Sequence, residues 1–322
     1  MIKNIVFMGT PSFAVPTLET LIKNNIIPVL IVSQPDKPKG RNQQLLPTPI
    51  KEVAQNNAIP CYQPEDVNLP ESIEYIKSFE PDLIVTVAYG AFLGKELRTL
   101  CPFGAINMHP SLLPKHRGAD PVRSTLLSND ELCGITVFFI TAKMDSGSII
   151  IQKQYAVEQG MNFTTLDGFL SQKGAEVIIE AIATISKSSK RFSELKSSFM
   201  MQNHEEATYS SKVDKLSTVA NFDLSVNEFL TKVKAYSNEP GYYCYFRGKR
   251  LKLLKAELFE VGNNSEYPVI KQVIKNEGFV VSLKDGEMLV REVQYEGKNI
   301  MSAWDFHIGA RIQIGERLCG EV

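Results

Sequence analysis

The alternation of apolar and amphipathic segments over the first 150 residues constrains the fold more than any other feature of this chain. Strands that alternate with helices are typical of a parallel sheet covered by helices. We therefore expect an α/β, Rossmann-like domain, with a mostly parallel open sheet and helices on both faces. Apolar runs predict strands near 2–8, 28–33, 83–88, 105–108 and 135–140. Helical spacing predicts helices near 15–24, 48–57, 70–78, 119–128 and 166–186.

The periodic pattern stops after residue 186, where a stretch rich in Ser and Lys begins. Such a composition predicts a linker. We place it at 190–209, between an N-terminal domain at 1–189 and a C-terminal domain at 210–322.

The second domain is predicted to be smaller and mostly β. It has one helical pattern near 226–233, and most of the remaining sequence alternates as strands do. Asp285-Gly286 lies between two apolar runs, which is typical of a hairpin turn.

The composition excludes several classes of protein. Apolar residues make up 43% of the chain, yet no apolar run approaches the roughly 20 residues that a membrane helix needs. The N-terminal residues predict a strand rather than an export signal, so we expect a cytoplasmic protein without membrane contact. Because the formal net charge is only −1, contact with nucleic acid would need local basic patches.

The positions of Cys and His argue against disulfides and a metal site. The five cysteines are scattered and form no Cys-x-x-Cys pair, so we expect reduced thiols. His109 and His116 lie seven residues apart across two prolines, which is not a helical spacing that aims both at one metal. The glycine-rich dinucleotide motif is also missing, because the next glycine after Gly9 is Gly40.

Asn107 and His109 stand out at the end of a predicted strand. Residues two apart in a strand point to the same side, so one pocket can hold both side chains. An amide donor beside an imidazole can hold a carbonyl oxygen as it becomes an oxyanion. The alternative is an Asn that caps a turn and a His that is satisfied within a loop.

Asp145 is the candidate proton acceptor. It follows the strand near 135–140, and it can reach His109 if the two strands are parallel neighbours whose C-terminal loops share one crevice. The alternative is that Asp145-Ser146-Gly147 is only a turn.

These residues resemble a known active-site signature. The signature is that of enzymes that transfer a formyl group from 10-formyltetrahydrofolate, and its residues here are Asn107-x-His109-Pro110-Ser111-Leu112-Leu113-Pro114, Arg117-Gly118 and the Asp145 loop. Within this family the chain is most similar to the members that act on aminoacylated tRNA. The stretches that carry this similarity are Phe7 to Ala14, Gln34 to Arg41, Pro81 to Gly90 and Thr208-Tyr209-Ser210-x-Lys212.

The resemblance implies direct transfer of the formyl group to the α-amino group of initiator methionyl-tRNA. The folate is a co-substrate, no metal takes part, and the enzyme is a monomer. Asn107 and protonated His109 would stabilise the oxyanion, while Asp145 would help to accept protons and hold His109 in position. The implied folate-binding residues are Val87, Ala88, Tyr89, Gly90, Ser111, Leu112, Leu113 and Pro114.

Two basic segments are implied to bind tRNA. The first is the proline-rich segment 34–49, which we expect to be a mobile loop when unbound. The second lies in a strand pair of a C-terminal β-barrel that is OB-like. Arg117 is either a solvated side chain or a contact to substrate. The predicted tRNA-binding residues are Lys37, Lys39, Arg41, Gln43, Gln44, Arg247, Lys249 and Arg250.

The sequence departs from the family pattern at a few positions. Around Asp145, the chain has Thr141, Lys143 and Ser148 where relatives usually have acidic residues and glycine. Asn42 and Glu239 also replace residues that are usual on the tRNA side. These departures affect the geometry of the loop and the contacts to tRNA.

Three rival functions remain. The first is a folate-dependent formyltransferase that acts on a nucleotide-linked amino sugar, which the basic segment 34–49 disfavours. The second is a non-catalytic RNA-binding protein, and the third is a hydrolase that releases formate from the folate. The intact Asn107, His109 and Asp145 argue against the second.

Overall fold

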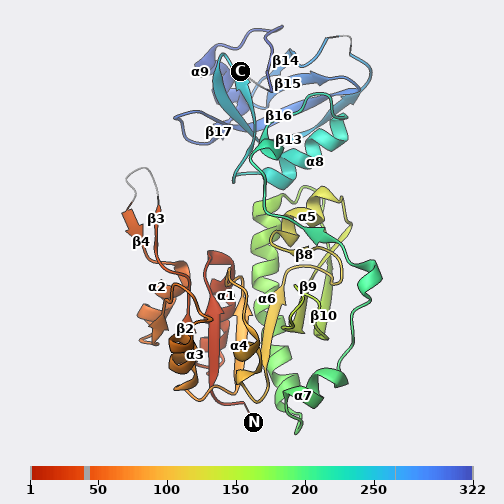
Figure 1. Ribbon diagram of the computed structural model, residues 1–322. Coiled ribbons are helices and arrows are strands. Elements are labelled where there is room, and N and C mark those ends of the chain that lie inside the picture. Colours follow the sequence, from red (N-terminus) through yellow and green to blue (C-terminus); the bar gives the residue numbers. More distant parts are fainter. Residues whose placement is uncertain (1, 40–43, 265, 321–322) are drawn as a thin grey trace. The chain divides into compact units, whose positions relative to one another are not determined.

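The computed structural model describes residues 2–39, 44–264 and 266–320 (Figure 1). The chain forms two compact units. The first unit comprises the chain up to Pro121, together with Leu132–Ala156 and Asp167–Ser210. The second unit comprises Val122–Glu131, Val157–Leu166 and the chain from Ser211 onward.

The first unit is built on a seven-stranded sheet with the order β10-β9-β7-β6-β1-β2-β5. Strands β1, β2, β5, β6 and β7 are parallel, whereas β9 and β10 are antiparallel to their neighbours. The mostly parallel sheet is confirmed, although β5 and β10 were not expected. Their bounds are β1 (Ile5–Gly9), β2 (Leu30–Val32), β5 (Cys61–Tyr62), β6 (Leu83–Val87), β7 (Ala105–His109), β9 (Leu132–Phe139) and β10 (Ile149–Ala156).

The direction of β9 corrects one expectation. β9 lies beside β7, as predicted, but runs antiparallel to it, with Asn107 opposite Phe138 and His109 opposite Thr136. The end of β9 therefore lies near the start of β7, where the amide of Ile140 donates to the carbonyl of Ala105 at 2.8 Å. The loop that follows β9 must run back along β7 to bring Asp145 to His109.

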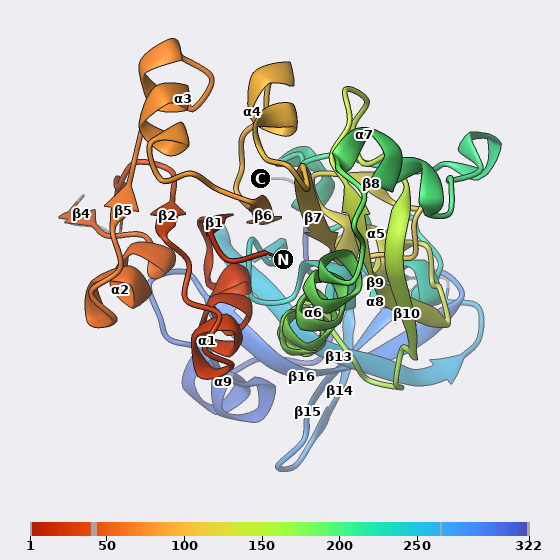
Figure 2. The ribbon, with the colours of Figure 1, turned by 90° about the horizontal axis from the view of Figure 1, so that it is seen from below.

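Helices cover both faces of this sheet. Figure 2 shows α3 and α4 on one face, with α1 and α6 on the other. Apolar side chains of α3 and α4 pack on the buried residues of β1, β2 and β6, which explains the near-continuous apolar sequence of these strands. The helix bounds are α1 (Val15–Lys23), α2 (Pro49–Asn56), α3 (Pro70–Lys77), α4 (Lys95–Leu100), α5 (Pro121–Leu127), α6 (Phe163–Ser186) and α7 (Phe192–Leu195).

The segment expected to be a linker packs on the first unit. The ring of Phe192 in α7 lies 5.6 Å from that of Phe139, measured between centroids. Further along, β11 (Tyr209–Ser210) pairs in parallel with β8 (Arg117–Gly118). Residues 190–209 thus belong structurally to the sheet domain rather than standing free between two domains.

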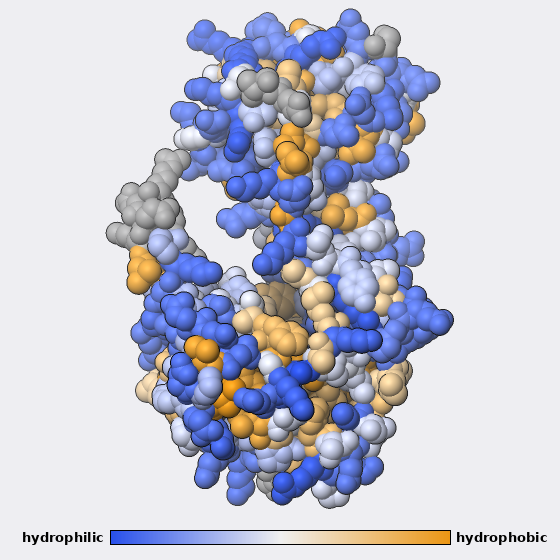
Figure 3. Space-filling view, in the orientation of Figure 1, coloured by the Kyte–Doolittle hydropathy of each residue, from blue (hydrophilic) through white to orange (hydrophobic). Residues whose placement is uncertain are grey.

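The segment 34–49, expected to be a mobile loop when unbound, contains a short hairpin. β3 (Lys37–Lys39) pairs with β4 (Gln44–Leu46), and Pro38 lies opposite Leu45. The side chain of Leu45 is 67% exposed, and Figure 3 shows hydrophobic colour on this hairpin beside the grey residues. Arg41 and Gln43 lie outside the described residues.

From Ser211 onward, the second unit is an antiparallel barrel with two α-helices among the described residues. The sheet order is β12-β13-β16-β15-β14, and β17 pairs with β16. The hairpin predicted at Asp285-Gly286 is confirmed, because Leu283 pairs with Gly286 across the turn. The bounds are α8 (Val226–Tyr236), β12 (Tyr242–Phe246), β13 (Lys249–Val261), β14 (Ile270–Ile274), β15 (Gly278–Leu283), β16 (Gly286–Tyr295), β17 (Met301–Ser302) and α9 (Ala303–Ala310).

Residues 315–319 close this sheet. Cys319 exchanges two backbone hydrogen bonds with Tyr245 on β12, at 2.7 and 3.0 Å. At the other edge, the amide of Gly315 donates to the carbonyl of Ile270 at 2.8 Å. Both edge strands are thereby paired, which agrees with the predicted C-terminal barrel.

No helix among the described residues is both long enough and apolar enough to cross a membrane.

Candidate active site

Asn107 is held by a neighbouring strand. It lies on β7 opposite Thr86 of β6, and the Thr86 hydroxyl is 2.7 Å from its Oδ1. The same hydroxyl lies 3.1 Å from the carbonyl of Ile106, and its shorter contact is with Oδ1 of Asn107, so that Nδ2 points away from Thr86. The intervening Met108 is buried on the opposite face, where it meets Gly174 of α6. The alternation along β7 therefore leaves the donor end of Asn107 on the side of His109.

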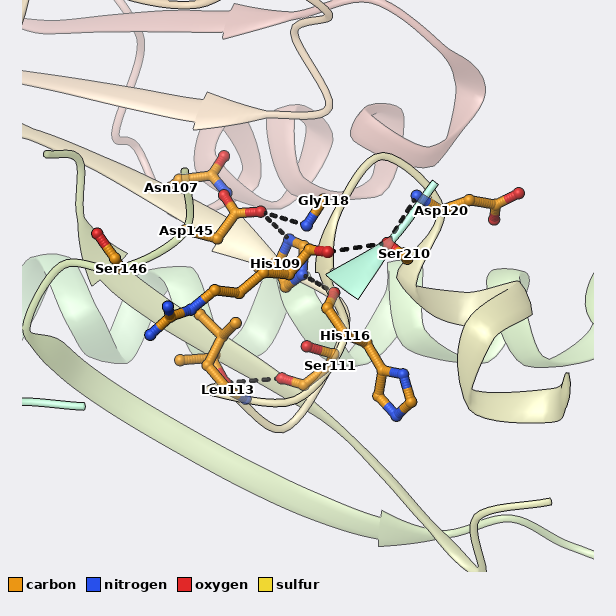
Figure 4. Close-up of polar contacts among 12 residues, drawn as sticks. Asn107, His109, Ser111, Leu113, His116, Gly118, Asp120, Asp145, Ser146 and Ser210 are labelled. Carbon is orange, nitrogen blue, oxygen red and sulfur yellow. Dashed lines mark hydrogen bonds and ion pairs between the residues drawn. The ribbon is translucent and has the colours of Figure 1, made fainter. Parts of the chain in front are cut away.

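His109 is buried, and its contacts define its tautomer. Nε2 lies 2.9 Å from the backbone carbonyl of His116. A carbonyl oxygen can only accept, so Nε2 carries a hydrogen. Nδ1 faces Oδ2 of Asp145 at 3.8 Å (Figure 4). The Nε2 side of the ring therefore faces a carbonyl, whereas the Nδ1 side faces a carboxylate.

Asp145 comes from the loop between β9 and β10. Its Oδ2 accepts a hydrogen bond of 2.7 Å from the amide of Gly118. Its backbone has φ of +48°, in the left-handed region that side-chain-bearing residues seldom adopt. Two residues on, a Cβ at Gly147 would lie 1.7 Å from the carbonyl oxygen of Phe139, so this position requires glycine. The structure thus brings Asn107, His109 and Asp145 together in one site (Figure 4).

The expected folate residues form two loops at the ends of neighbouring parallel strands, β6 and β7. In the first, Val87 and Tyr89 are buried, whereas Ala88 and Gly90 are exposed. Ala88 and Gly90 both have positive φ, at 47° and 91°. Burial raises the pKa of Tyr89 to about 12, so its phenol stays neutral near pH 7.

The second loop packs partly on itself. The hydroxyl of Ser111 donates to the carbonyl of Lys115 at 2.8 Å. Leu113 is buried, and its amide donates to the Thr136 hydroxyl at 3.2 Å. Leu112 and Pro114 are partly exposed. Ser111 and Leu113 therefore shape the loop, while Leu112 and Pro114 present surface.

Comparison with known sequences identifies the family. Residues 3–182 match the family described as formyl transferase, and residues 212–311 match the formyl transferase C-terminal domain. The chain belongs to the formyl transferase family.

Its full-length relatives are named for one activity. The chain is 37% identical to a methionyl-tRNA formyltransferase from Kosmotoga olearia, over 98% of this chain and 99% of that protein. It is 34% identical to the methionyl-tRNA formyltransferase of Thermotoga maritima, over 97% of each chain. The fold resembles an N-formyltransferase from Helicobacter canadensis, solved with folinic acid and dTDP-3-aminofucose. That likeness has a TM-score of 0.62 at 20% identity, over 92% of this chain and 100% of the other.

In this formyl transferase, the residues expected to bind tRNA differ in their surroundings. Lys37 and Lys249 are exposed. Arg247 is engaged within the barrel, since Nε and Nη2 donate to the carboxylate of Glu316 at 2.8 and 2.9 Å. The hydrogen bond from Glu316 helps to raise the pKa of Arg247 above its usual value. Arg247 therefore stabilises the barrel. The side chains of Lys39 and Gln44 lie outside the described part of the chain.

Sequence reasoning missed two groups of residues. The first is Gln202, which is buried beside the active site although no periodicity marks it in its polar stretch. Its partner Arg117, which the sequence left open as a solvated side chain or a substrate contact, is not solvated but buried and bonded to Gln202. Tyr243 and Tyr245 lie on the face of β12 opposite its buried residues, which the alternation Tyr242-Tyr243-Cys244-Tyr245-Phe246 was sufficient to show.

Within the described ranges, no group of three or more His, Cys, Asp or Glu residues is arranged to hold a metal ion.

Proposed function

We propose that this enzyme transfers the formyl group of 10-formyltetrahydrofolate to the α-amino group of methionine on initiator methionyl-tRNA. The observation that carries the proposal is the arrangement of Asn107, His109 and Asp145, in which an amide donor and a carboxylate-paired imidazole share one site. The similarity over nearly the whole chain to methionyl-tRNA formyltransferases supports the choice of acceptor.

The reaction forms one C–N bond and breaks another. The free amine attacks the formyl carbon, the carbonyl electrons move onto oxygen, and the bond from carbon to N10 of the folate then breaks. N10 gains a proton, and the attacking nitrogen loses one. An α-amine has a pKa of about 7.7 to 8.0, so much of it must be deprotonated before it can attack at neutral pH.

Each of the three side chains has a proposed role that its contacts support. Asn107 donates to the developing oxyanion through Nδ2, because its Oδ1 is already engaged by Thr86. His109 acts through its Nδ1 edge and positive charge, because its Nε2 hydrogen is given to the His116 carbonyl. Asp145 holds that charge and accepts the proton that leaves the amine.

The folate is proposed to bind at the two loops after β6 and β7. Ala88, Gly90, Leu112 and Pro114 offer apolar surface and exposed backbone there, which suits a flat ring system held by shape and backbone hydrogen bonds. The neutral phenol of Tyr89 is not a proton acceptor at pH 7.

The second unit is proposed to contact RNA through the outward face of β12 and β13. Tyr243 and Tyr245 lie opposite Lys252 and Arg250 in the strand register. The two tyrosine rings are 5.9 Å apart between centroids, and the Arg250 guanidinium lies 4.9 Å from the centre of the Tyr243 ring. Aromatic rings with adjacent cations stack bases and neutralise phosphates in RNA-binding barrels.

The deciding experiment combines purified enzyme, 10-formyltetrahydrofolate and initiator methionyl-tRNA, and measures N-formylmethionine. Formylation of the charged tRNA, but not of uncharged tRNA, is expected. Release of free formate without an acceptor would instead identify a hydrolase. Activity only on a nucleotide-linked amino sugar would identify the other formyltransferase, and RNA binding without folate turnover would mean a non-catalytic protein.

Matched variants test the RNA surface separately. Since stacking contributes about 1–3 kcal/mol per base, Tyr243→Ala with Arg250→Ala is expected to raise the KM for methionyl-tRNA at least about fivefold. Arg247→Ala is the control, because its side chain is paired with Glu316, and its KM should stay within about twofold of the wild type. An equal rise in KM for the double variant and for Arg247→Ala would contradict the proposed RNA surface on β12 and β13.

A further inference from the structure

A buried glutamine links the catalytic loop to a distant part of the chain. Gln202 comes from the segment after α7, and its side chain is 7% exposed. Its Nε2 donates to two backbone carbonyls of the loop, those of Asp145 at 2.9 Å and Gly147 at 2.8 Å. Its Oε1 accepts from Nε and Nη2 of Arg117, at 3.2 and 2.6 Å. All four hydrogen-bonding positions of the amide are thus occupied.

These partners fix the orientation of the amide. If the amide of Gln202 turned over, its oxygen would face two carbonyl oxygens and its NH2 group would face the Arg117 guanidinium. Arg117 is 3% exposed, and its Nη2 also contacts Nδ1 of His204 at 2.9 Å. The pair therefore has one stable arrangement, and burial makes that arrangement costly to leave.

Arg117 and Gly118 connect this pair to the carboxylate itself. The amide of Gly118 donates to Oδ2 of Asp145, while the preceding Arg117 holds Gln202. Asp145 is consequently held on both sides, through its side chain by Gly118 and through its backbone by Gln202. Its backbone is in a left-handed conformation, which persists only when the surroundings impose it.

We propose that Gln202 is a positioning residue, which acts through the backbone of Asp145 and Gly147 to hold the Asp145 carboxylate opposite Nδ1 of His109. The inference rests on the proposed function, because it concerns how that active site is assembled. Gln202 itself has no role in proton transfer or in binding either substrate. Misplacement of a reacting group by about 1 Å can reduce the rate about a hundredfold, so loss of this contact should lower kcat strongly.

Two substitutions at position 202 separate the two halves of the contact. Gln202→Leu removes all four hydrogen bonds at similar volume. Gln202→Glu keeps an acceptor for Arg117 but has no donor for the loop carbonyls. We expect both to lower kcat about 10- to 100-fold, with KM for each substrate within about threefold. Asn203→Ala is the control, since Asn203 is exposed and bonds only within its own turn, and it should stay within about twofold.

The decisive test makes the Gln202→Leu substitution in an enzyme that lacks the Asp145 carboxylate. In an Asp145→Asn background, measured by single turnover, Gln202→Leu should change the rate less than about threefold, because the group that it positions is gone. An undiminished effect in that background, near-normal turnover of Gln202→Glu, or near-normal turnover of Gln202→Leu would each overturn the proposal.

A second measurement covers a variant that unfolds. If Gln202→Leu is not folded, Gln202→Glu is compared with the wild type by hydrogen exchange of residues 141–148. Faster exchange is expected in the variant, and unchanged exchange would contradict the proposal.

Failure of the proposed function looks different. If Asp145→Asn alone turns over normally, the role of Asp145 is wrong, whereas slow Asp145→Asn with normal Gln202 variants removes only this inference.

Discussion

The two halves of the active site are held in different ways. Asn107 and His109 lie on β7, a buried strand between two others, where Thr86 bonds to the amide of Asn107 and the His116 carbonyl bonds to Nε2 of His109. Asp145 lies on a loop with a left-handed backbone, held by Gly118 and by Gln202 from a segment 57 residues further along the chain. The strand places its side chains by regular geometry, whereas the loop depends on particular distant contacts. Substitutions near the two halves should therefore differ in kind.

The largest effect is expected on the strand side. Asn107→Ala and His109→Ala should each lower kcat about 10²- to 10³-fold, because each removes a group that stabilises the oxyanion. The fold should survive, since the sheet around β7 keeps its hydrogen bonds. Steady-state kinetics with thermal unfolding would test this, and turnover close to normal in either variant would contradict the assigned roles.

Gly147→Ala should displace the loop that carries Asp145, through steric overlap alone. Its Cβ would lie 1.7 Å from the Phe139 carbonyl, so the loop must shift. We expect a loss of about 1–3 kcal/mol of stability and a kcat at least about tenfold lower. Gly168→Ala in α6 is the control, because nothing lies within 4 Å of its Cβ and alanine favours a helix. Comparable losses of stability and kcat in Gly147→Ala and Gly168→Ala would show that the shift of the Asp145 loop is not their cause.

Thr86→Val tests, on the strand side, whether the Thr86 hydroxyl orients Asn107. It removes the hydroxyl that orients the Asn107 amide while keeping the buried volume. A hydrogen bond of this kind contributes about 1 kcal/mol, so kcat should fall about fivefold, with little change in the KM for folate. An unchanged kcat would mean that the strand alone orients Asn107.

The smallest effect is expected from Ser146→Ala, next to the catalytic carboxylate. Among the described residues, the Ser146 hydroxyl bonds to the Thr141 hydroxyl and to the carbonyl of Lys143, both within the same loop. We expect kcat to stay within about twofold and stability within about 0.5 kcal/mol. A larger fall in kcat would mean that contacts within the loop also hold Asp145 in position, and it would weaken the role proposed for Gln202.

The sequence predicted those features that depend on regular local geometry. The parallel strands, the helices on both faces and the shared side of Asn107 and His109 follow from periods of 3.6 and 2 residues. The direction of β9 was not accessible, because a run of buried residues reads alike in a parallel and an antiparallel strand. Asp145 was a candidate because it follows a predicted strand, and the family resemblance supported it. The parallel arrangement that was to bring it to His109 was wrong, because β9 runs antiparallel to β7.

Contacts between residues far apart in the sequence were missed, and so was one local hairpin. Gln202 contacts Arg117 and Asp145 across 85 and 57 residues, and nothing local marks it as buried. The hairpin β3–β4 was hidden by Pro38, which usually argues against a strand. The Arg247 ion pair with Glu316, 69 residues later, was likewise beyond a reading of local patterns.

The return of residues 202–210 to the 117–120 loop has a consequence for synthesis. A ribosome that has made the chain as far as residue 190 has already produced every strand of the seven-stranded sheet and all of α6. Gln202, which bonds to Arg117 and to the backbone of Asp145, has not yet been translated. Because residues 202–210 belong to the same unit as the sheet, and domains fold as units during synthesis, this unit can be completed only after they have been made. The part of the unit that is translated last is therefore the part that completes its active site.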